Sequence, residues 1–115
     1  MKKDETGFPV YRLSYRLLIE IFNLTSNMKK SHKYTAGERL NNEALDLMIN
    51  VSRANKVKEQ RLEKITKAQE NIEAIRIIFR LLLDTKQISL RRFVSVNEII
   101  EDILKQLFGW QKSTR

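Results

Sequence analysis

The feature that most restricts the fold is a long interval without glycine or proline. Between Gly37 and Gly109 the sequence contains neither residue, and the whole chain has three glycines and a single proline, Pro9. A β-rich fold needs many turns, which depend heavily on these two residues. Leu, Ile, Glu, Lys, Arg and Asn dominate instead, and charged residues make up 31% of the chain. This composition is typical of long amphipathic helices, so the sequence predicts an all-α fold.

Four segments of the 115-residue chain repeat apolar residues at intervals of three and four, the period of an amphipathic helix. They predict helices over about 9–28, 36–55, 58–86 and 90–110, in one domain covering residues 1–115. Such helices, joined by short polar breaks, favour an antiparallel up-down-up-down four-helix bundle. The residues predicted to face its core are Val10, Leu13, Leu17, Ile21, Leu24 and Met28; Leu40, Ala44, Leu47, Val51 and Ala54; Ile65, Ala68, Ile72, Ile75, Phe79 and Leu82; and Phe93, Val96, Ile100, Ile103, Leu107 and Trp110.

Local signals predict where these helices begin and end. Pro9 suits the first turn of a helix, where its missing N–H is not needed. Thr35 and Glu38 have the spacing of a capping box, which predicts a basic loop up to Tyr34 and a helix start directly after it. Ser89 is a predicted N-cap for the last helix. The basic tail after Trp110 is expected to fray.

Apolar residues outside the core-facing stripes exceed what a lone bundle can bury. A bundle helix needs one apolar stripe about 100° wide. The surplus predicts self-association or a protein partner, and the alternative is a wider core. The surplus residues are Ile19, Phe22, Leu45, Met48, Ile49, Ile77, Ile78, Leu81, Ile99, Leu104 and Phe108.

The residue inventory argues against catalysis. Without cysteine there is no disulfide, thiolate metal site or cysteine nucleophile, and this fits a reducing compartment. His32, the single histidine, is expected in the basic loop without other metal ligands, and no Gly-rich phosphate loop or triad base is present. We therefore expect a protein that is not an enzyme and holds no cofactor or metal. The apolar runs are too short for a membrane span and no signal peptide precedes them, so a cytoplasmic location is expected.

The charge predicts a polyanionic partner. Lys and Arg number 22 against 14 Asp and Glu, which gives a net charge of +8 and a pI near 9.9. Such a surface favours nucleic acid through counterion release, and the alternative is a merely basic protein. Few aromatic residues are available for stacking, so binding is expected through the nucleic-acid backbone and shape.

Several arginines sit where their charge is unfavourable without an anion. Two pairs four residues apart repel on one helix face, and a third pair lies where a helix macrodipole disfavours positive charge. A phosphate-bearing ligand would relieve these costs; the alternative is that the arginines lie along apolar surface or pair with carboxylates. The predicted contacts are Arg12 and Arg16, Arg76 and Arg80, Arg91 and Arg92, with Lys30, Lys33 and Arg39 beside them.

Taken in order, several segments resemble the accessory variability determinant proteins of diversity-generating retroelements. The segments are Tyr34-Thr35-Ala36-Gly37-Glu38-Arg39-Leu40, Ala54-Asn55, Glu73-Ala74-Ile75-Arg76, Phe79-Arg80-Leu81-Leu82-Leu83-Asp84, Ile88-Ser89 and Leu107-Phe108-Gly109-Trp110. The resemblance spans about Tyr11 to Trp110. The chain departs from it before the second helix, where the family commonly has Phe-Pro and this sequence has Asn27-Met28-Lys29-Lys30.

The resemblance implies a four-helix bundle that assembles as a homopentameric barrel and binds a reverse transcriptase together with its template RNA. It implies no catalysis by the protein itself, but support of error-prone cDNA synthesis that diversifies a target gene; DNA binding is left open. The wider family includes four-helix proteins encoded in intervening sequences of ribosomal RNA genes. Membership of that branch is the alternative: a structural or regulatory oligomer with no reverse transcriptase partner.

Overall fold

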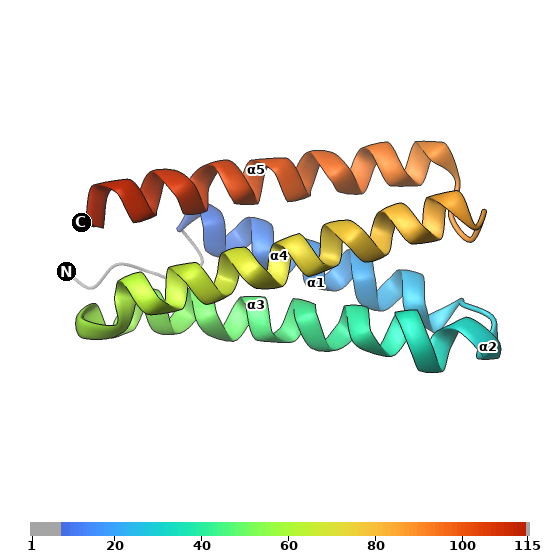
Figure 1. Ribbon diagram of the computed structural model, residues 1–115, viewed down its shortest axis with the longest axis horizontal. Coiled ribbons are helices and arrows are strands. Elements are labelled where there is room, and N and C mark those ends of the chain that lie inside the picture. Colours follow the sequence, from blue (N-terminus) through green and yellow to red (C-terminus); the bar gives the residue numbers. More distant parts are fainter. Residues whose placement is uncertain (1–7, 115) are drawn as a thin grey trace.

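The computed structural model describes residues 8–114, and four long helices dominate this range (Figure 1). They are α1 (Pro9–Ser26), α3 (Glu38–Lys56), α4 (Arg61–Asp84) and α5 (Leu90–Thr114). Three short pieces connect them: α2 (Lys30–His32), the π-helical turn η2 (Lys33–Gly37) and the 3₁₀ turn η3 (Lys58–Gln60). The predicted all-α bundle of four helices is confirmed.

The long helices run alternately in opposite directions and enclose one elongated core. Both α1 and α4 pack between α3 and α5, so α1 and α4 occupy opposite corners of the bundle. Figure 1 shows α2, the end of α4 and the start of α5 at one end of the molecule, which we call the α2 end. The turn from α3 to α4 and the last residues of α5 lie at the opposite end. The molecule measures 45 × 23 × 20 Å.

The predicted core stripes of α3 and α4 are confirmed in full, because all of their members are buried. The stripe of α1 is rotated from the prediction. Ser14 and Thr25 are buried there, whereas Leu13 and Leu24 are only half-buried. The Thr25 hydroxyl lies 3.2 Å from the carbonyl oxygen of Phe22 and 3.2 Å from Asn41 Oδ1 on α3, either of which can accept its proton. This partner allows a polar residue to occupy the stripe.

Arg61 ties the helices together at the end opposite α2. Its Nε donates to the carbonyl oxygen of Ala54 at 2.7 Å and its Nη2 to that of Asn55 at 3.1 Å, so it caps the last turn of α3. The guanidinium also lies 6.0 Å from the ring centre of Trp110 on α5. Trp110 in turn meets Phe8, at the start of α1, edge to face at 4.9 Å. All four long helices therefore meet in one cluster.

The predicted basic loop and capping box are wrong, because helical backbone resumes at Lys30 and continues through η2 into α3. The Thr35 hydroxyl turns back toward the carbonyl oxygens of Ser31 and His32, at 3.4 and 3.2 Å, instead of capping Glu38. His32 accordingly lies in a helical turn.

A close approach between η2 and the end of α1 accompanies this helical start. A Cβ atom on Gly37 would lie 3.1 Å from Met28 Sδ and 3.5 Å from Thr25 Cγ2. Because Gly37 has no side chain, η2 packs directly onto the end of α1. A capping-box pattern cannot reveal this contact, since it depends on residues from the preceding helix.

The other helix ends agree with the sequence signals in two places and differ in three. Pro9 occupies the first turn of α1, and the Ser89 hydroxyl accepts from the Arg92 N–H at 3.0 Å as the N-cap of α5. By contrast, α1 ends earlier than predicted, at Ser26, and α4 begins at Arg61 after the 3₁₀ turn. The expected frayed tail is helical as far as Thr114, because nothing after Gly109 stops the helix.

Lys86, two residues after the end of α4, adopts a conformation that suits glycine better. Its φ is 62°, in the left-handed region. The Gln87 N–H donates to the carbonyl oxygen of Leu82 at 2.8 Å, and the Lys86 N–H to that of Leu83 at 3.0 Å, the hydrogen-bond pattern of a Schellman motif.

We therefore expect Lys86→Gly to unfold at higher urea concentration than Lys86→Ala, with a free energy of unfolding larger by about 1 kcal/mol. Both substitutions remove the same charge, so their difference isolates the backbone strain. Equal stability of the two variants would show that Lys86 is not strained.

Candidate nucleic-acid interface

Seven of the predicted basic contacts lie on elements that the fold brings to the α2 end. Lys30 is in α2, Lys33 begins η2 and Arg39 is in the first turn of α3. Arg76 and Arg80 lie in the second half of α4, and Arg91 with Arg92 opens α5. The other two, Arg12 and Arg16, lie on the first half of α1, outside this cluster.

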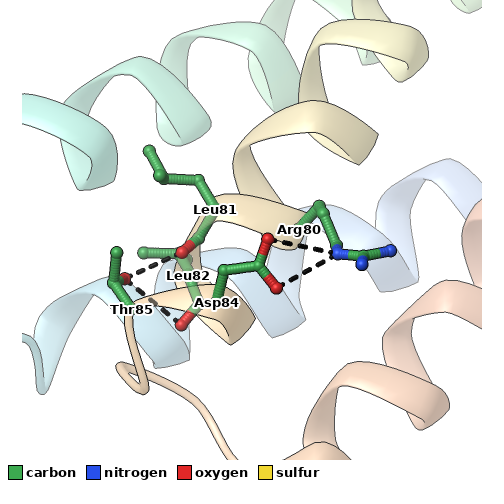
Figure 2. Close-up of polar contacts among 5 residues, drawn as sticks. All are labelled: Arg80, Leu81, Leu82, Asp84 and Thr85. Atoms are coloured by element: carbon green, nitrogen blue, oxygen red, sulfur yellow. Dashed lines mark hydrogen bonds and ion pairs between the residues drawn. The ribbon is translucent and has the colours of Figure 1, made fainter.

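Four of these arginines are paired with carboxylates. Arg39 Nε lies 2.9 Å from Glu43 Oε2, and Arg80 Nε lies 3.2 and 3.3 Å from the two carboxylate oxygens of Asp84 (Figure 2). The ion-pairing alternative thus describes these residues.

The two remaining arginines, Arg76 and Arg92, each pair with a carboxylate on another helix, and Arg76 also pairs within α4. Arg76 Nη1 lies 3.5 Å from Glu101 Oε2 on α5, and Arg76 Nε lies 3.6 Å from Glu73 Oε1. Arg92 Nη2 lies 3.4 Å from Glu20 Oε1 on α1. All five pairs are partly exposed, and such pairs contribute only about 0–1 kcal/mol each. A phosphate can therefore compete for these arginines at modest cost.

The other five cations carry charge that no neighbour compensates. Among residues 8–114, none of them has a carboxylate within ion-pair distance, and all are exposed. They are Lys30, Lys33, Arg91, Arg12 and Arg16.

Two open grooves flank the outer face of α4 near the α2 end. One, of about 500 Å³ between α4 and α5, is lined by Arg76, Ile77, Arg80, Phe93, Asn97 and Glu101. The second, of about 430 Å³ between α4 and the η2–α3 segment, is lined by Thr35, Ala36, Arg39, Ala74, Ile77, Ile78 and Leu81. Ile77 stands between them with 69% of its surface exposed, and Leu81 is 52% exposed. Ile77 and Leu81 thus form an exposed apolar ridge on α4, and each of the two grooves beside it contains at least one arginine.

Sequence reasoning named the lining arginines as contacts and the lining residues Ile77, Ile78 and Leu81 as surplus apolar surface, but it did not predict the grooves. Ala74, Ile77 and Leu81 follow helical spacing, so a helical wheel would have placed them on one face of α4. The partners Ala36 and Asn97 come from other helices, and no local motif marks them.

The surplus apolar surface is partly exposed, as predicted. Two of its members, Ile99 and Leu104, are instead buried, at 5% and 4%, because α5 packs against both α1 and α4 and so buries a wider face. Met48 and Ile78 are half-buried. The exposed members are Ile19, Phe22, Leu45, Ile49, Ile77, Leu81 and Phe108.

Metal-ligating side chains do not gather anywhere in residues 8–114: no three of His, Cys, Asp or Glu lie together as an ion would require. No helix in the same range has both the length and the apolar character needed to cross a bilayer.

The architecture defines a small four-helix-bundle protein, with a group of basic residues at its α2 end. The bAvd-like family model matches residues 10–114, and the chain belongs to this family. This confirms the resemblance to accessory variability determinant proteins.

A solved crystal structure supports the fold independently. It is that of a protein of unknown function from the S23 ribosomal protein family of Bacteroides thetaiotaomicron, with a TM-score of 0.83 and 18% sequence identity. The match covers 90% of this chain and 98% of that chain. At this identity the likeness shows the fold alone. A search of curated proteins finds no match.

Arg12 and Arg16 on α1, which pair with no carboxylate of residues 8–114, provide a test of the charge distribution. Arg12 and Arg16 repel each other at i,i+4, near the positive end of the helix macrodipole. We expect Arg12→Glu to raise the free energy of unfolding by about 0.5 kcal/mol at low salt, with a smaller gain at high salt. Arg12→Gln removes the repulsion without adding an ion pair, so its free energy of unfolding should lie between those of the wild type and Arg12→Glu. Urea unfolding at two salt concentrations measures this, and the absence of any gain at low salt would contradict it.

Proposed function

We propose that the protein is a non-catalytic accessory component of a diversity-generating retroelement. In this role it binds a reverse transcriptase and its template RNA and supports mutagenic cDNA synthesis. Membership of the bAvd-like family supports the role, and the surface supports the ligand class. A location in the cytoplasm, where such a complex would act, belongs to the same proposal.

The observation that carries RNA binding is the set of uncompensated cations at the α2 end. Lys30, Lys33 and Arg91 come from three elements and have no carboxylate partner among residues 8–114. Fixed positive charges on a helical scaffold attract phosphates and release counterions. Few aromatic side chains lie beside them, so recognition would depend on the RNA backbone and shape. DNA offers similar phosphates and is a comparison in the test.

Arg76 and Arg80 are the pair whose removal tests the interface directly. Both line the groove between α4 and α5, and both are held by carboxylates that a phosphate can replace. We expect the purified protein to bind a structured RNA with affinity that falls steeply as salt rises. Arg76→Ala with Arg80→Ala should weaken binding and lower the salt slope by about 1 to 2.

The matched control is Lys105→Ala with Lys112→Ala. It removes the same charge from the second half of α5, which lies away from the α2 end. It should weaken binding less, with an unchanged helical circular dichroism spectrum in both double variants. Equal losses would mean that net charge alone binds RNA. Binding that does not respond to salt, or no binding, would count against the proposal.

The exposed apolar residues support a further part of the proposal, assembly into a homo-oligomer, with a pentamer as the expected size. Ile77 is the most exposed large apolar side chain of the described residues. We expect Ile77→Glu to lower the mass seen by light scattering while the bundle stays folded, because Ile77 contributes little to the core. Thr66→Glu, an exposed site on the same helix, is the control. A monomeric wild-type protein would contradict this assembly.

The structural likeness to an S23-family protein favours one alternative, a structural or regulatory four-helix oligomer of the ribosomal intervening-sequence type. The two proposals differ in their partner. Copurification with a reverse transcriptase encoded beside this gene, reduced when the α2 end is altered, supports the first. A stable oligomer that binds neither polymerase nor RNA supports the second.

A further inference from the structure

A chain of hydrogen bonds runs from α3 to α4, returns to α3 and ends on Arg39. Asn50 Nδ2 donates to Asn71 Oδ1 at 2.8 Å, and Asn71 Nδ2 donates to Glu43 Oε1 at 2.9 Å. The other carboxylate oxygen, Glu43 Oε2, accepts from Arg39 Nε at 2.9 Å. Each Glu43 oxygen therefore has its own donor, and the carboxylate is fixed from two sides.

The chain runs from half-buried side chains to an exposed end. Asn50 and Asn71 are half-buried between the helices, and the Glu43 side chain is only 15% exposed. The Arg39 side chain is 65% exposed. A carboxylate shielded in this way is hard to move, because its amide partner belongs to the neighbouring helix. The Glu43 carboxylate thus holds the Arg39 guanidinium at Nε, while most of the Arg39 side chain is exposed to solvent.

Arg39 is held through Nε alone. Within residues 8–114 its two terminal nitrogens make no hydrogen bond or ion pair, so four N–H donors remain available. Two parallel N–H groups from such a fork match two oxygens of one phosphate. Arg39 also lines the groove between α4 and the η2–α3 segment, so a backbone phosphate at its edge would reach these donors.

Arg80 provides an internal comparison on the adjacent helix. It too is held through Nε by a carboxylate four residues later, and Figure 2 shows its terminal nitrogens directed away from that carboxylate. The Asp84 side chain, however, is 58% exposed and has no cross-helix partner among the described residues. Asp84 can therefore move with Arg80, whereas Glu43 cannot move freely with Arg39.

We propose that Arg39 binds an RNA backbone phosphate and that Glu43 and Asn71 are positioning residues that hold its guanidinium in the binding geometry. This inference rests on the proposed function and adds a specific phosphate contact to it. A side chain already ordered before binding loses less conformational entropy when the ligand arrives. Glu43 and Asn71 thus act on RNA only through Arg39.

Neutralising Glu43 separates positioning from simple electrostatics, because the two predict opposite signs. By charge alone, Glu43→Gln should tighten RNA binding, since it removes a negative charge beside the site. If Glu43 positions Arg39, the same substitution should weaken binding, because Arg39 and Asn71 donate to different carboxylate oxygens and Gln replaces one of these with an NH₂ group, which cannot accept.

The experiment compares Glu43→Gln with Asp84→Asn, which makes the same charge change beside an exposed pair. The probe is a fluorescently labelled RNA hairpin titrated at fixed salt. We expect Glu43→Gln to bind about threefold to tenfold more weakly than Asp84→Asn. In an Arg39→Ala background, Glu43→Gln should cause no further loss, because its effect passes through Arg39. The positioning role would be overturned if Glu43→Gln bound RNA as tightly as Asp84→Asn or more tightly. It would also be overturned if the losses from Glu43→Gln and Arg39→Ala were additive.

A second readout does not depend on RNA. In the wild-type protein the Arg39 Nε–H should give a resolved NMR signal protected from solvent exchange, and Glu43→Gln should abolish it. Asn71→Ala should weaken the same signal while retaining the charge, which keeps the test valid if Glu43→Gln unfolds. Absence of the wild-type signal would overturn the inference. Wild-type protein that binds no RNA while the signal is present would overturn the proposed function and the phosphate role of Arg39, but not the held guanidinium.

Discussion

The burial of α4 between α3 and α5 is the constraint on which the rest of the molecule depends. Its seam of alternating three- and four-residue spacing, from Ile65 to Leu82, is almost completely removed from water. Apolar burial of this kind provides the main driving force for folding. It also fixes the direction and register of the neighbouring helices. Because those helices alternate in direction, one end of the bundle receives the end of α4 together with the starts of α3 and α5. Seven of the predicted basic contacts lie there as a result.

The sequence was sufficient to predict the elements that are governed by periodic patterns. The strict spacing in α3 and α4 identified their core residues, and the local caps at Pro9 and Ser89 were correct because each involves only nearby residues. The α2 region was predicted wrongly for the opposite reason. Its helical start accompanies the close approach of Gly37 to Met28 and Thr25, which are nine and twelve residues earlier in the chain. A capping pattern contains no information about that packing.

The candidate site shows the same division. Basic residues on α2, α4 and α5 could be proposed from charge spacing alone, and so could ion pairs at i,i+4 spacing, but the pairs between helices could not. Arg92 pairs with Glu20 on another helix, and Arg76 with Glu101. Likewise, Asn71 reaches Glu43 across the bundle, so nothing in the residues around Arg39 indicates that its carboxylate is held. Buried polar residues such as Ser14 were equally invisible to a pattern based on hydrophobicity.

The cluster of Arg61, Trp110 and Phe8 gives the two ends of the molecule different local stability. At its end, the helices are joined by a shared cation, an aromatic pair and two capping hydrogen bonds. The α2 end has instead a π-helical turn, a short polar connection and ion pairs open to water. Local opening has a lower free energy where few apolar contacts hold the backbone. Backbone amides near the α2 end should therefore exchange with solvent before those around Trp110, and shape adjustment to a ligand would concentrate beside the cations while the far end acts as a fixed anchor.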